Sequence, residues 1–445
     1  MIWTGRFLCL LALGAAAPLV IWLLGGSPLT SGLGLLLFDA LLLLTAWIDG
    51  WRTERVDTWL VERQLAPRLM LGEPNTVEIR LTVPAGRALQ LDLRDDFPPG
   101  LELVGARDLR LKLPRSTTSS RVVSVGYQLL APRRGEYHFG DLHIRCRSPW
   151  GLVRRQSAYP AAASCRVYPN LRQAHREELT FRQLYPFRFG QHPARQRGQG
   201  RDFESLRDYL PGDDLRDIAW LATARRGRLV TRQYRFEHHQ RVVLLLDAGR
   251  LMTSRIDHLT KLDHAINAAL SLSRIVLAAG DQLGLLIFDQ EVRSWLPPQR
   301  GPAHFQKLLE ALYQVEARLV EPSHERACAY LSYVNPRRSL VLLLTDVVDE
   351  VASAQLLTAT ASLLPRHLPL VVTIGDLDLS HLVDLPPMTV EEVYRQSVAE
   401  DLLQHRREAL ARIAERGALT LDLPTTQLAP SLIHQYFQIR DRRLV

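Results

Sequence analysis

Lysine is scarce in this 445-residue chain, which contains only Lys112, Lys261 and Lys307. The formal net charge of +8 at pH 7 therefore comes almost wholly from arginine. An arginine bias can reflect codon composition, but an excess of basic residues also favours binding to nucleic acid or to an anionic membrane surface. The sequence has no nucleic-acid-binding motif, whereas it does have hydrophobic spans. We therefore expect a lipid bilayer as a partner, and no nucleic acid.

Cysteine is also scarce, and the four cysteines have no CxxC or Cys/His spacing typical of a metal site. Cys9 falls in an apolar run, and Cys328 stands alone. Cys146 and Cys165 could form a disulfide only if their segment were outside the cell. The pattern favours free, buried thiols in a reducing compartment.

The common catalytic motifs are missing: there is no P-loop, no G-x-S-x-G and no HExxH. Gly198–Gly200 has the spacing of a phosphate-binding turn, but no helix-starting sequence follows it. The adjacent His238 and His239 would point to opposite faces of a strand, so one metal would hardly use both. Asp213 and Asp214 are interpreted as part of a turn that caps a helix. We assign no catalytic residue.

At 445 residues the chain predicts two or three domains. Phe7–Leu24 is an almost unbroken apolar run that would span roughly 27 Å as a helix, close to a bilayer core. A second apolar run occupies Leu33–Ile48. Together they predict a transmembrane helical hairpin in residues 1–50. A signal peptide is the alternative for the first run, but the second span and the lack of a clear cleavage site argue against it.

Positive residues flank the two predicted spans on the same side: Arg6 precedes the first, and Arg52 and Arg55 follow the second. This predicts a two-span protein of the cell inner membrane with cytoplasmic N- and C-termini. Asp39 falls inside the second span, where an ionisable residue costs about 2.5–3.5 kcal/mol. It either fixes packing against Gly14 and its neighbours or mediates self-association in the membrane.

Residues 51–170 differ from the apolar N-terminal segment. Short runs that alternate between apolar and polar residues appear there between turn residues. Period-two alternation with turns every ten or so residues predicts an immunoglobulin-like β-sandwich. Its simplest role is that of a spacer or an interaction module. The runs are TVEIRLTV, LQLDLRDD, LELVG, LRLKL, RVVSVGYQLL, EYHFGDLHIRCR and SCRVYP.

Residues 241–445 alternate between apolar strands and helices. Val242–Gly249 begins the series, and its continuous apolar character suits a parallel strand that is covered on both faces. The alternation predicts an α/β domain with a doubly wound parallel sheet. Acidic residues fall at the carboxyl ends of the strands, where open α/β sheets place their sites.

A charged signature and connector segment, residues 171–240, links these two predicted domains. Its second half interleaves acidic residues, arginines and aromatic residues. It resembles the bacterial domain-of-unknown-function family numbered fifty-eight, whose members are membrane-anchored proteins with a von Willebrand factor A-like (VWA-like) domain. The resemblance rests on Gly198, Gly200, Phe203–Tyr209, Pro211–Asp213, Arg216, Ile218–Trp220 and Ala224–Arg225. Residues 132–155 also resemble the family, with Ser148-Pro149-Trp150-Gly151-Leu152 where the family has Asp-Pro-Phe-Gly-Leu.

The resemblance implies a VWA-like α/β domain in residues 241–445 and draws attention to the metal site of such domains. That site holds Mg²⁺ with an Asp-x-Ser-x-Ser loop, a Thr and a later Asp. Here Asp247 is present and the later strand ends in Thr345 and Asp346, but Gly249 and Leu251 replace the hydroxyls. We therefore interpret the metal site as degenerate and expect no cofactor. Binding of Mg²⁺ stays an open alternative. The neighbouring arginine, residue 250, could substitute for a cation.

The signature residues are candidates for a docking face or a structural lock. They are Glu204, Arg207, Tyr209, Asp213, Arg216, Trp220 and Arg225. Helical spacing would place like charges on one face, so we expect arginine–carboxylate pairs that lock the segment to the α/β sheet. Trp220 is expected to be buried at that joint.

Two functions from different classes follow. The first is a membrane-anchored, cytoplasm-facing adaptor or scaffold with a VWA-like head. The resemblance implies a MoxR-type AAA+ ATPase as its partner. The alternative is an envelope-associated hydrolase that uses carboxylates of the signature segment, which would require a deep pocket and carboxyl groups with raised pKa.

Overall fold

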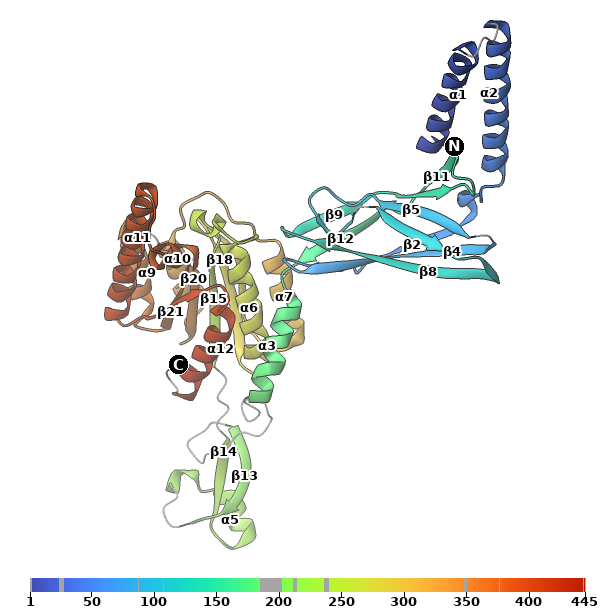
Figure 1. The fold of residues 1–445 in the computed structure, drawn as a ribbon. Helices are drawn as coiled ribbons and strands as arrows, with labels where there is room; N and C mark the ends of the chain where they lie inside the picture. Colours follow the sequence, from blue (N-terminus) through green and yellow to red (C-terminus); the bar gives the residue numbers. More distant parts are fainter. Residues whose placement is uncertain are drawn as a thin grey trace. The chain divides into compact units, whose positions relative to one another are not determined.

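The structure is a computed structural model. It describes residues 2–23, 28–86, 88–106, 108–184, 202–210, 214–235, 240–347, 350–375, 377–442 and 444. The chain divides into two compact units, Met1–Asn170 and Leu171–Val445 (Figure 1). Each unit is described separately.

Two apolar helices begin the first unit, α1 (Gly5–Leu23) and α2 (Pro28–Trp51), and they lie side by side (Figure 1). They pack closely, because a Cβ on Gly14 would lie 2.2 Å from the Phe38 ring. In the described residues, one helical stretch, Gly32–Thr58, is long and apolar enough to cross a bilayer. A shorter apolar helical stretch, Gly5–Ala16, lies within α1. The structure thus supports one candidate span near the N-terminus, where the sequence predicted two.

The rest of the first unit consists of β-sheets. A five-stranded sheet has the order β1-β11-β10-β5-β7, a four-stranded sheet the order β2-β4-β8-β6, and a three-stranded sheet the order β3-β12-β9. Strand β5 alternates between buried and less buried residues, as the period of two in the sequence predicts. The strands are β1 (Ile2–Trp3), β2 (Leu60–Gln64), β3 (Arg68–Met70), β4 (Pro74–Gly86), β5 (Leu89–Asp95), β6 (Glu102–Val104), β7 (Leu109–Leu113), β8 (Ser116–Leu130), β9 (Gly135–Phe139), β10 (Leu142–Arg147), β11 (Val153–Tyr159) and β12 (Ala163–Tyr168).

A buried ion pair joins the five-stranded and four-stranded sheets. Arg63 of β2 donates from Nε to Asp95 Oδ2 of β5 at 3.0 Å, and its Nη2 also contacts this carboxylate. Arg63 donates further to the Gly140 carbonyl at 3.0 Å, and the hydroxyl of Tyr127 on β8 donates to Asp95. Because both charged side chains are almost fully buried, their mutual contacts replace the water that each group loses.

The second unit is built on a six-stranded sheet of order β19-β18-β15-β20-β21-β22. Five of these strands run parallel, and β19 pairs antiparallel with β18 at one edge. The sequence predicted a wholly parallel sheet and missed β19, because Pro297 and Pro298 argue against a strand; an edge strand tolerates them. The strands are β15 (Arg241–Asp247), β18 (Gln282–Phe288), β19 (Val292–Gln299), β20 (Leu340–Thr345), β21 (Leu368–Gly375) and β22 (Leu419–Pro424), and β16 (Arg255–Ile256) and β17 (Leu259–Thr260) form a small separate pair.

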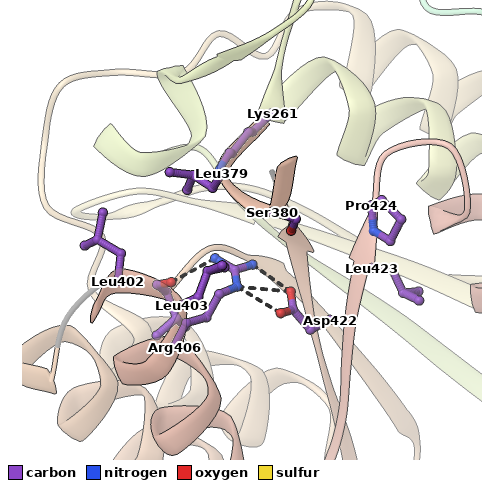
Figure 2. Close-up of a pocket in the computed structure, with 11 residues that line it drawn as sticks. Lys261, Leu379, Ser380, Leu402, Leu403, Arg406, Asp422, Leu423 and Pro424 are labelled. Atoms are coloured by element: carbon purple, nitrogen blue, oxygen red, sulfur yellow. Dashed lines mark hydrogen bonds and ion pairs between the residues drawn. The ribbon is translucent and has the colours of Figure 1, made fainter. Parts of the chain in front are cut away.

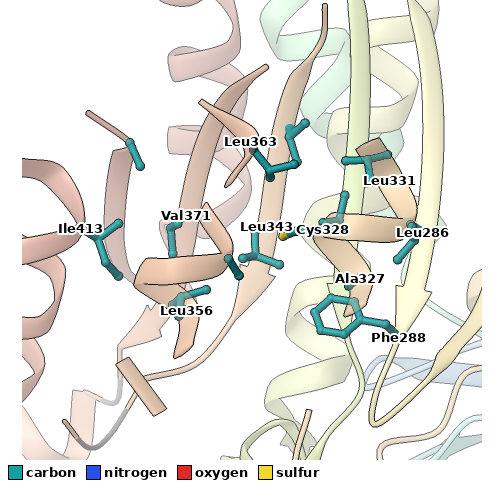
Figure 3. Close-up of a cluster of buried hydrophobic side chains, with 14 of the residues drawn as sticks. Leu286, Phe288, Ala327, Cys328, Leu331, Leu343, Leu356, Leu363, Val371 and Ile413 are labelled. Atoms are coloured by element: carbon teal, nitrogen blue, oxygen red, sulfur yellow. The ribbon is translucent and has the colours of Figure 1, made fainter. Parts of the chain in front are cut away.

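Helices cover both faces of the six-stranded sheet, so its central strands are buried along their whole length. Helices α8, α9 and α11 contribute to one large apolar cluster with β15, β18, β20 and β21 (Figure 3). The helices of this unit are α3 (Leu171–Leu184), α6 (Lys261–Ala278), α7 (Pro302–Tyr313), α8 (His324–Val334), α9 (Glu350–Leu363), α10 (Leu377–Asp384), α11 (Val390–Glu415) and α12 (Leu428–Asp441), with the short η3 (Arg250–Thr253).

All four cysteines are free thiols. Cys146, Cys165 and Cys328 are buried, and burial raises the pKa of the Cys146 and Cys328 thiols to about 12. These thiols are therefore protonated and unreactive at neutral pH. Cys9, in α1, is exposed.

Candidate functional site

Where it is described, the signature segment folds as a β-hairpin with two short helices. Strand β13 (Asp202–Asp208) pairs antiparallel with β14 (Val230–Arg235), and η2 (Leu215–Asp217) and α5 (Trp220–Arg226) lie between them. The candidate residues are spread over this hairpin. Glu204 and Arg207 lie in β13, Tyr209 just after it, Arg216 in η2, and Trp220 and Arg225 in α5, while Asp213 lies outside the described residues.

The prediction that Trp220 is buried is wrong, because 66% of this residue is exposed. The buried positions are instead its neighbours Ile218 and Ala219 together with Val230. Ala219 N donates to the Val230 carbonyl at 2.8 Å, so these smaller residues form the local core and leave the indole outside. The helical spacing assumed for residues 204–208 is also wrong, because this stretch is a strand.

An ion pair in the described part of this hairpin is local. Arg228 contacts Asp208 at 2.8 Å, and both side chains are more than half exposed. Arg207 donates to the Asp208 carbonyl at 3.3 Å. Exposed pairs of this kind contribute about 0–1 kcal/mol. They therefore stabilise the hairpin itself and are not the expected lock onto the six-stranded sheet.

Asp247, at the carboxyl end of β15, takes part in a buried chain of hydrogen bonds. Thr345, at the end of β20, donates its hydroxyl proton to Asp247 Oδ2 at 2.6 Å, and Gly249 N donates to Oδ1 at 2.7 Å. His324 Nε2 lies 3.2 Å from the Thr345 hydroxyl oxygen. Because Thr345 gives its proton to Asp247, its oxygen is an acceptor for Nε2–H, which selects this tautomer of His324.

Asp346, the next residue after β20, is held by two internal cations. Lys261 Nζ, from the first turn of α6, donates to Asp346 Oδ2 at 2.6 Å. Arg406 Nη1, from α11, donates to Oδ1 at 2.5 Å and to the Val347 carbonyl at 2.9 Å. The other side of the Arg406 guanidinium binds Asp422 of β22, with Nη2 at 2.8 Å from Oδ1 (Figure 2).

This arrangement does not fit a magnesium site. The two carboxylates that would ligate the ion are already engaged, Asp247 by two hydrogen bonds and Asp346 by two cations. A side chain at Gly249 would lie 2.8 Å from Pro322 Cδ, so the missing hydroxyl has no room there. Over the described ranges, no group of three or more His, Cys, Asp or Glu side chains is placed to hold a metal.

Arg250 does not act as the substitute cation that the sequence suggested. It is partly exposed and pairs with Glu321 at 2.5 Å. Lys261 and Arg406 provide the positive charge instead, and sequence reasoning missed both. One signal was available for Lys261, because a cation in the first turn of a helix is disfavoured by the helix dipole and needs an acidic partner. Arg406 lies 60 residues from Asp346, and no local pattern connects them.

A small pocket of about 210 Å³ adjoins this ion-pair cluster (Figure 2). Lys261, Arg406 and Asp422 line its polar side, and leucines such as Leu379 and Leu402 line its apolar side. The charged side chains that line the pocket are engaged in ion pairs with neighbouring side chains. The rest of the pocket wall is apolar.

Leu379 and Leu402 also line an open groove of about 730 Å³ between α10 and α11. Large apolar residues of this region stay in solvent, and Tyr394, on the groove wall, is 76% exposed. We call this surface the α10–α11 face and define it by its exposed apolar residues. They are Leu382, Leu385, Met388, Val390, Val393, Tyr394 and Val398. Four of these residues, Leu382, Val390, Tyr394 and Val398, line the same groove. Exposed apolar residues gathered in one place mark an interaction site more often than a lone exposed leucine does.

Burial shifts the pKa of both titratable groups in the Asp247 chain, in opposite directions. It raises the pKa of Asp247 to about 6, although the hydrogen bonds from Thr345 and Gly249 act the other way. Burial lowers the pKa of His324 to about 4. Ionised Asp247 thus costs stability above pH 6, and this cost is relieved as the pH falls towards 4. Neutral His324 contributes stability above pH 6.5, which is lost over the same range.

We expect Asp247→Asn to stabilise the second unit at pH 7.5 by about 2–3 kcal/mol, because it removes a buried charge. Between pH 6.5 and 4 the variant should lose stability steeply through His324, whereas the two groups nearly cancel in the wild type. Hydrogen exchange of the β15 and β20 amides in the full chain measures both effects. Exposed Asp384→Asn is the matched control. An Asp247→Asn variant less stable than wild type at pH 7.5 would contradict this expectation.

Two bacterial proteins similar to this chain are described as uncharacterized. The chain is 24% identical over 283 residues to the uncharacterized protein YeaD of Bacillus subtilis, covering 63% of this chain and 67% of the relative. It is also 24% identical over 264 residues to the uncharacterized protein Rv1480 of Mycobacterium tuberculosis, covering 56% of this chain and 82% of the relative.

Among solved structures, the conserved hypothetical protein BatB from Bacteroides thetaiotaomicron aligns with a TM-score of 0.33 and 13% identity, over 46% of this chain and 99% of BatB. Proximal thread matrix protein 1 from the mussel byssus aligns with a TM-score of 0.25 and 12% identity, over 44% of this chain and 46% of that protein. Residues 205–414, which include β14, the six-stranded sheet up to β21 and most of α11, match the family described as protein of unknown function DUF58.

Proposed function

We propose that this protein is a membrane-anchored, cytoplasm-facing adaptor or scaffold whose second unit is a VWA-like head that binds other proteins. The observation that carries the proposal is the α10–α11 face, a group of solvent-exposed apolar residues on the head. Keeping such residues in water costs free energy, on the order of 25 cal/mol for each Å² of apolar surface. A partner protein that covers the face would recover that energy.

The strand order supports a VWA-like head. Numbered along the chain, the six strands follow the doubly wound order 3-2-1-4-5-6, with the antiparallel strand at the edge next to strand 2. In such sheets ligands bind beyond the carboxyl ends of the strands. The ion-pair cluster around Asp346 and the adjoining pocket lie at those ends, and the pocket shares Leu379 and Leu402 with the groove between α10 and α11.

The charge around the α10–α11 face indicates the chemistry of the partner. Residues 377–403 contain six carboxylates and one arginine, a formal charge of −5 in a chain whose net charge is +8. A basic segment with an apolar side, such as an amphipathic helix, complements both properties. The carboxylates are Asp378, Asp384, Glu391, Glu392, Glu400 and Asp401. We propose that a MoxR-type AAA+ ATPase presents this segment.

The first unit would supply the anchor. We propose that α1 enters the bilayer beside α2, with both chain termini in the cytoplasm. The outward residues of both helices are largely apolar and exposed, including Leu13 and Leu36, and lipid would cover them. Asp39 lies within α2, and its Oδ1 has no hydrogen-bond partner in the described part of the chain. A second copy could provide one, so self-association through Asp39 is part of the proposal.

Capture of the ATPase from membranes tests the adaptor function. The full chain in detergent should retain a MoxR-type ATPase, identified by mass spectrometry. Tyr394→Glu should reduce the amount retained by at least about tenfold, because a charge in the apolar face costs 1.4 kcal/mol or more of binding free energy. Tyr333→Glu is the matched control, since Tyr333 is an 85% exposed tyrosine on α8. If no ATPase is retained, or if both variants retain it equally, the proposal is wrong.

A further inference from the structure

The loop Ser148–Leu152, between β10 and β11, is fastened to the end of α2. Asp49, which is fully buried, accepts hydrogen bonds from three groups of this loop. Trp150 N donates to Oδ1 at 3.0 Å, Leu152 N donates to Oδ2 at 3.1 Å, and the Ser148 hydroxyl also contacts Oδ2. One carboxylate therefore fixes the backbone of the loop to the last turns of the apolar helix.

The same loop is fastened to the start of α1. Thr4 donates its hydroxyl proton to the Gly151 carbonyl at 2.6 Å, and Thr4 N donates to the Leu152 carbonyl at 3.0 Å. Gly151 has a φ of +75°, a conformation that side chains disfavour, so glycine suits this position. A small apolar cluster completes the joint: Phe7, Leu42, Ala46, Leu152 and Val153. The loop is thus held between the bases of both helices.

Three tryptophans are exposed around this joint. Trp3 is 50% exposed at the start of α1, Trp51 is 76% exposed at the end of α2, and Trp150 is 46% exposed in the loop between them. Tryptophan is enriched where a membrane meets water, because its ring is apolar while its N–H needs a polar partner. Their position at the ends of apolar helices is the position of such an interfacial belt.

Positive charge lies among these tryptophans. The Arg52 guanidinium lies 5.6 Å from the centre of the Trp150 ring. Arg6 lies on the other side of the loop, with Nη1 3.2 Å from where a Cβ on Gly151 would be. Both arginines are exposed, and in the part of the chain that the structure describes neither has a carboxylate at ion-pair distance. Arg55, Arg147 and Arg154 add positive charge nearby, against Glu54 and Asp57.

We propose that the loop Ser148–Leu152 is a membrane-contacting element of the first unit. Trp150, with Trp3 and Trp51, occupies the headgroup layer of the bilayer, and Arg52 and Arg6 bind the phosphates of anionic lipids. This inference rests on the proposed insertion of the apolar helices. It adds that the β-sheets of the first unit are held against the membrane surface at a fixed position, and do not swing on a flexible tether.

The environment of residue 150 tests the inference directly. The full chain carrying Cys9→Ser and Trp150→Cys is labelled with the fluorophore NBD, since the other native thiols are buried. Val122→Cys, at an exposed position of β8, is the matched control. In vesicles of phosphatidylcholine with phosphatidylglycerol, the label at 150 should emit at shorter wavelength and be quenched by iodide several-fold less than the label at 122. Pro149→Cys, next to it and exposed, should behave as position 150 does.

Two further measurements vary the lipid composition and test whether the apolar helices are inserted in the membrane. Shielding at position 150 should weaken in phosphatidylcholine alone and when Arg52→Gln is added, because the arginine then has no anionic headgroup or no charge. Equal quenching at 150 and 122, or shielding that does not depend on the anionic lipid, overturns the inference. Alkaline carbonate extraction separates this from failure of the anchor. A chain that resists extraction but shows equal quenching is anchored without this contact, whereas a chain that is extracted was never inserted.

Discussion

Arg406→Met should lower the stability of the second unit by about 3–5 kcal/mol, the typical cost of removing one partner from a buried ion pair. Arg406 is almost fully buried and binds both Asp346 and Asp422. Methionine preserves much of the side-chain volume, but it leaves Asp346 with one cation, Lys261, and deprives Asp422 of its ionic partner. The framework at the carboxyl ends of β20 and β22 would therefore open. Hydrogen exchange of the amides in these strands, measured in the full chain, gives the change in opening free energy.

Arg395→Met is the matched control for this measurement. It removes an arginine from the same helix, but Arg395 pairs with Glu391 on the surface, where both side chains are about 70% exposed. The expected cost is below about 0.5 kcal/mol. If Arg406→Met costs no more than Arg395→Met, the ion-pair cluster does not stabilise the sheet as described.

Arg63→Met should destabilise the first unit by a similar amount, about 3–5 kcal/mol, because it leaves the Asp95 carboxylate buried without its cation. Arg63 also loses hydrogen bonds to two backbone carbonyls and its stacking over Phe139, whose ring centre is 4.9 Å away. Among the side chains that the structure describes, Tyr127 would remain as a hydrogen-bond donor to Asp95. Burial raises the pKa of Tyr127 well above its ordinary range, so this hydroxyl stays protonated and cannot replace the lost charge.

Urea unfolding of the full chain, followed by hydrogen exchange in β5 and β8, reports this loss. Arg80→Met is the control, because Arg80 pairs with Glu78 at 3.7 Å on an exposed part of β4. A second variant, Arg63→Met with Asp95→Asn, should recover part of the stability by removing the unpaired charge. A single variant as stable as the control would mean that the two sheets are held together by their apolar residues alone.

The strands of the second unit could be predicted from sequence because their physical cause is local. A strand covered on both faces must be apolar throughout, and β15, β20 and β21 stand out as continuous apolar runs for that reason. The strands of the first unit could be predicted for a similar local reason. A strand with one buried face alternates between buried and exposed residues, as β5 does. Strand β19 was missed because its two prolines are compatible with a strand only at an edge, and the sequence does not tell which strand is the edge.

The candidate site could be predicted only in part, because its contacts join distant residues. Asp247, Thr345 and Asp346 were found through the resemblance to VWA-like domains, whose metal-site pattern these residues match in part. Lys261 contacts Asp346 across 85 residues, and His324 contacts Thr345 from a helix whose sequence gives no sign of it. Trp220 shows the opposite error, because an aromatic residue among charges suggested burial, while its smaller neighbours form the core of that hairpin. The loop Ser148–Leu152 was found as a resemblance, and the structure supplies its physical reason in the bonds from Asp49.

We propose that the head binds its partner through the α10–α11 face, and that the Asp247 and Asp346 clusters hold the sheet and recruit no metal. Retention of the ATPase by wild type, Tyr394→Glu and Asp247→Asn, measured side by side from membranes, tests this most directly. We expect Asp247→Asn to retain as much ATPase as wild type, with or without a chelator during the washes, and Tyr394→Glu to lose it. If Asp247→Asn loses the ATPase and Tyr394→Glu retains it, the α10–α11 face is not the binding site, and binding takes place at a metal-dependent site at the carboxyl ends of the strands.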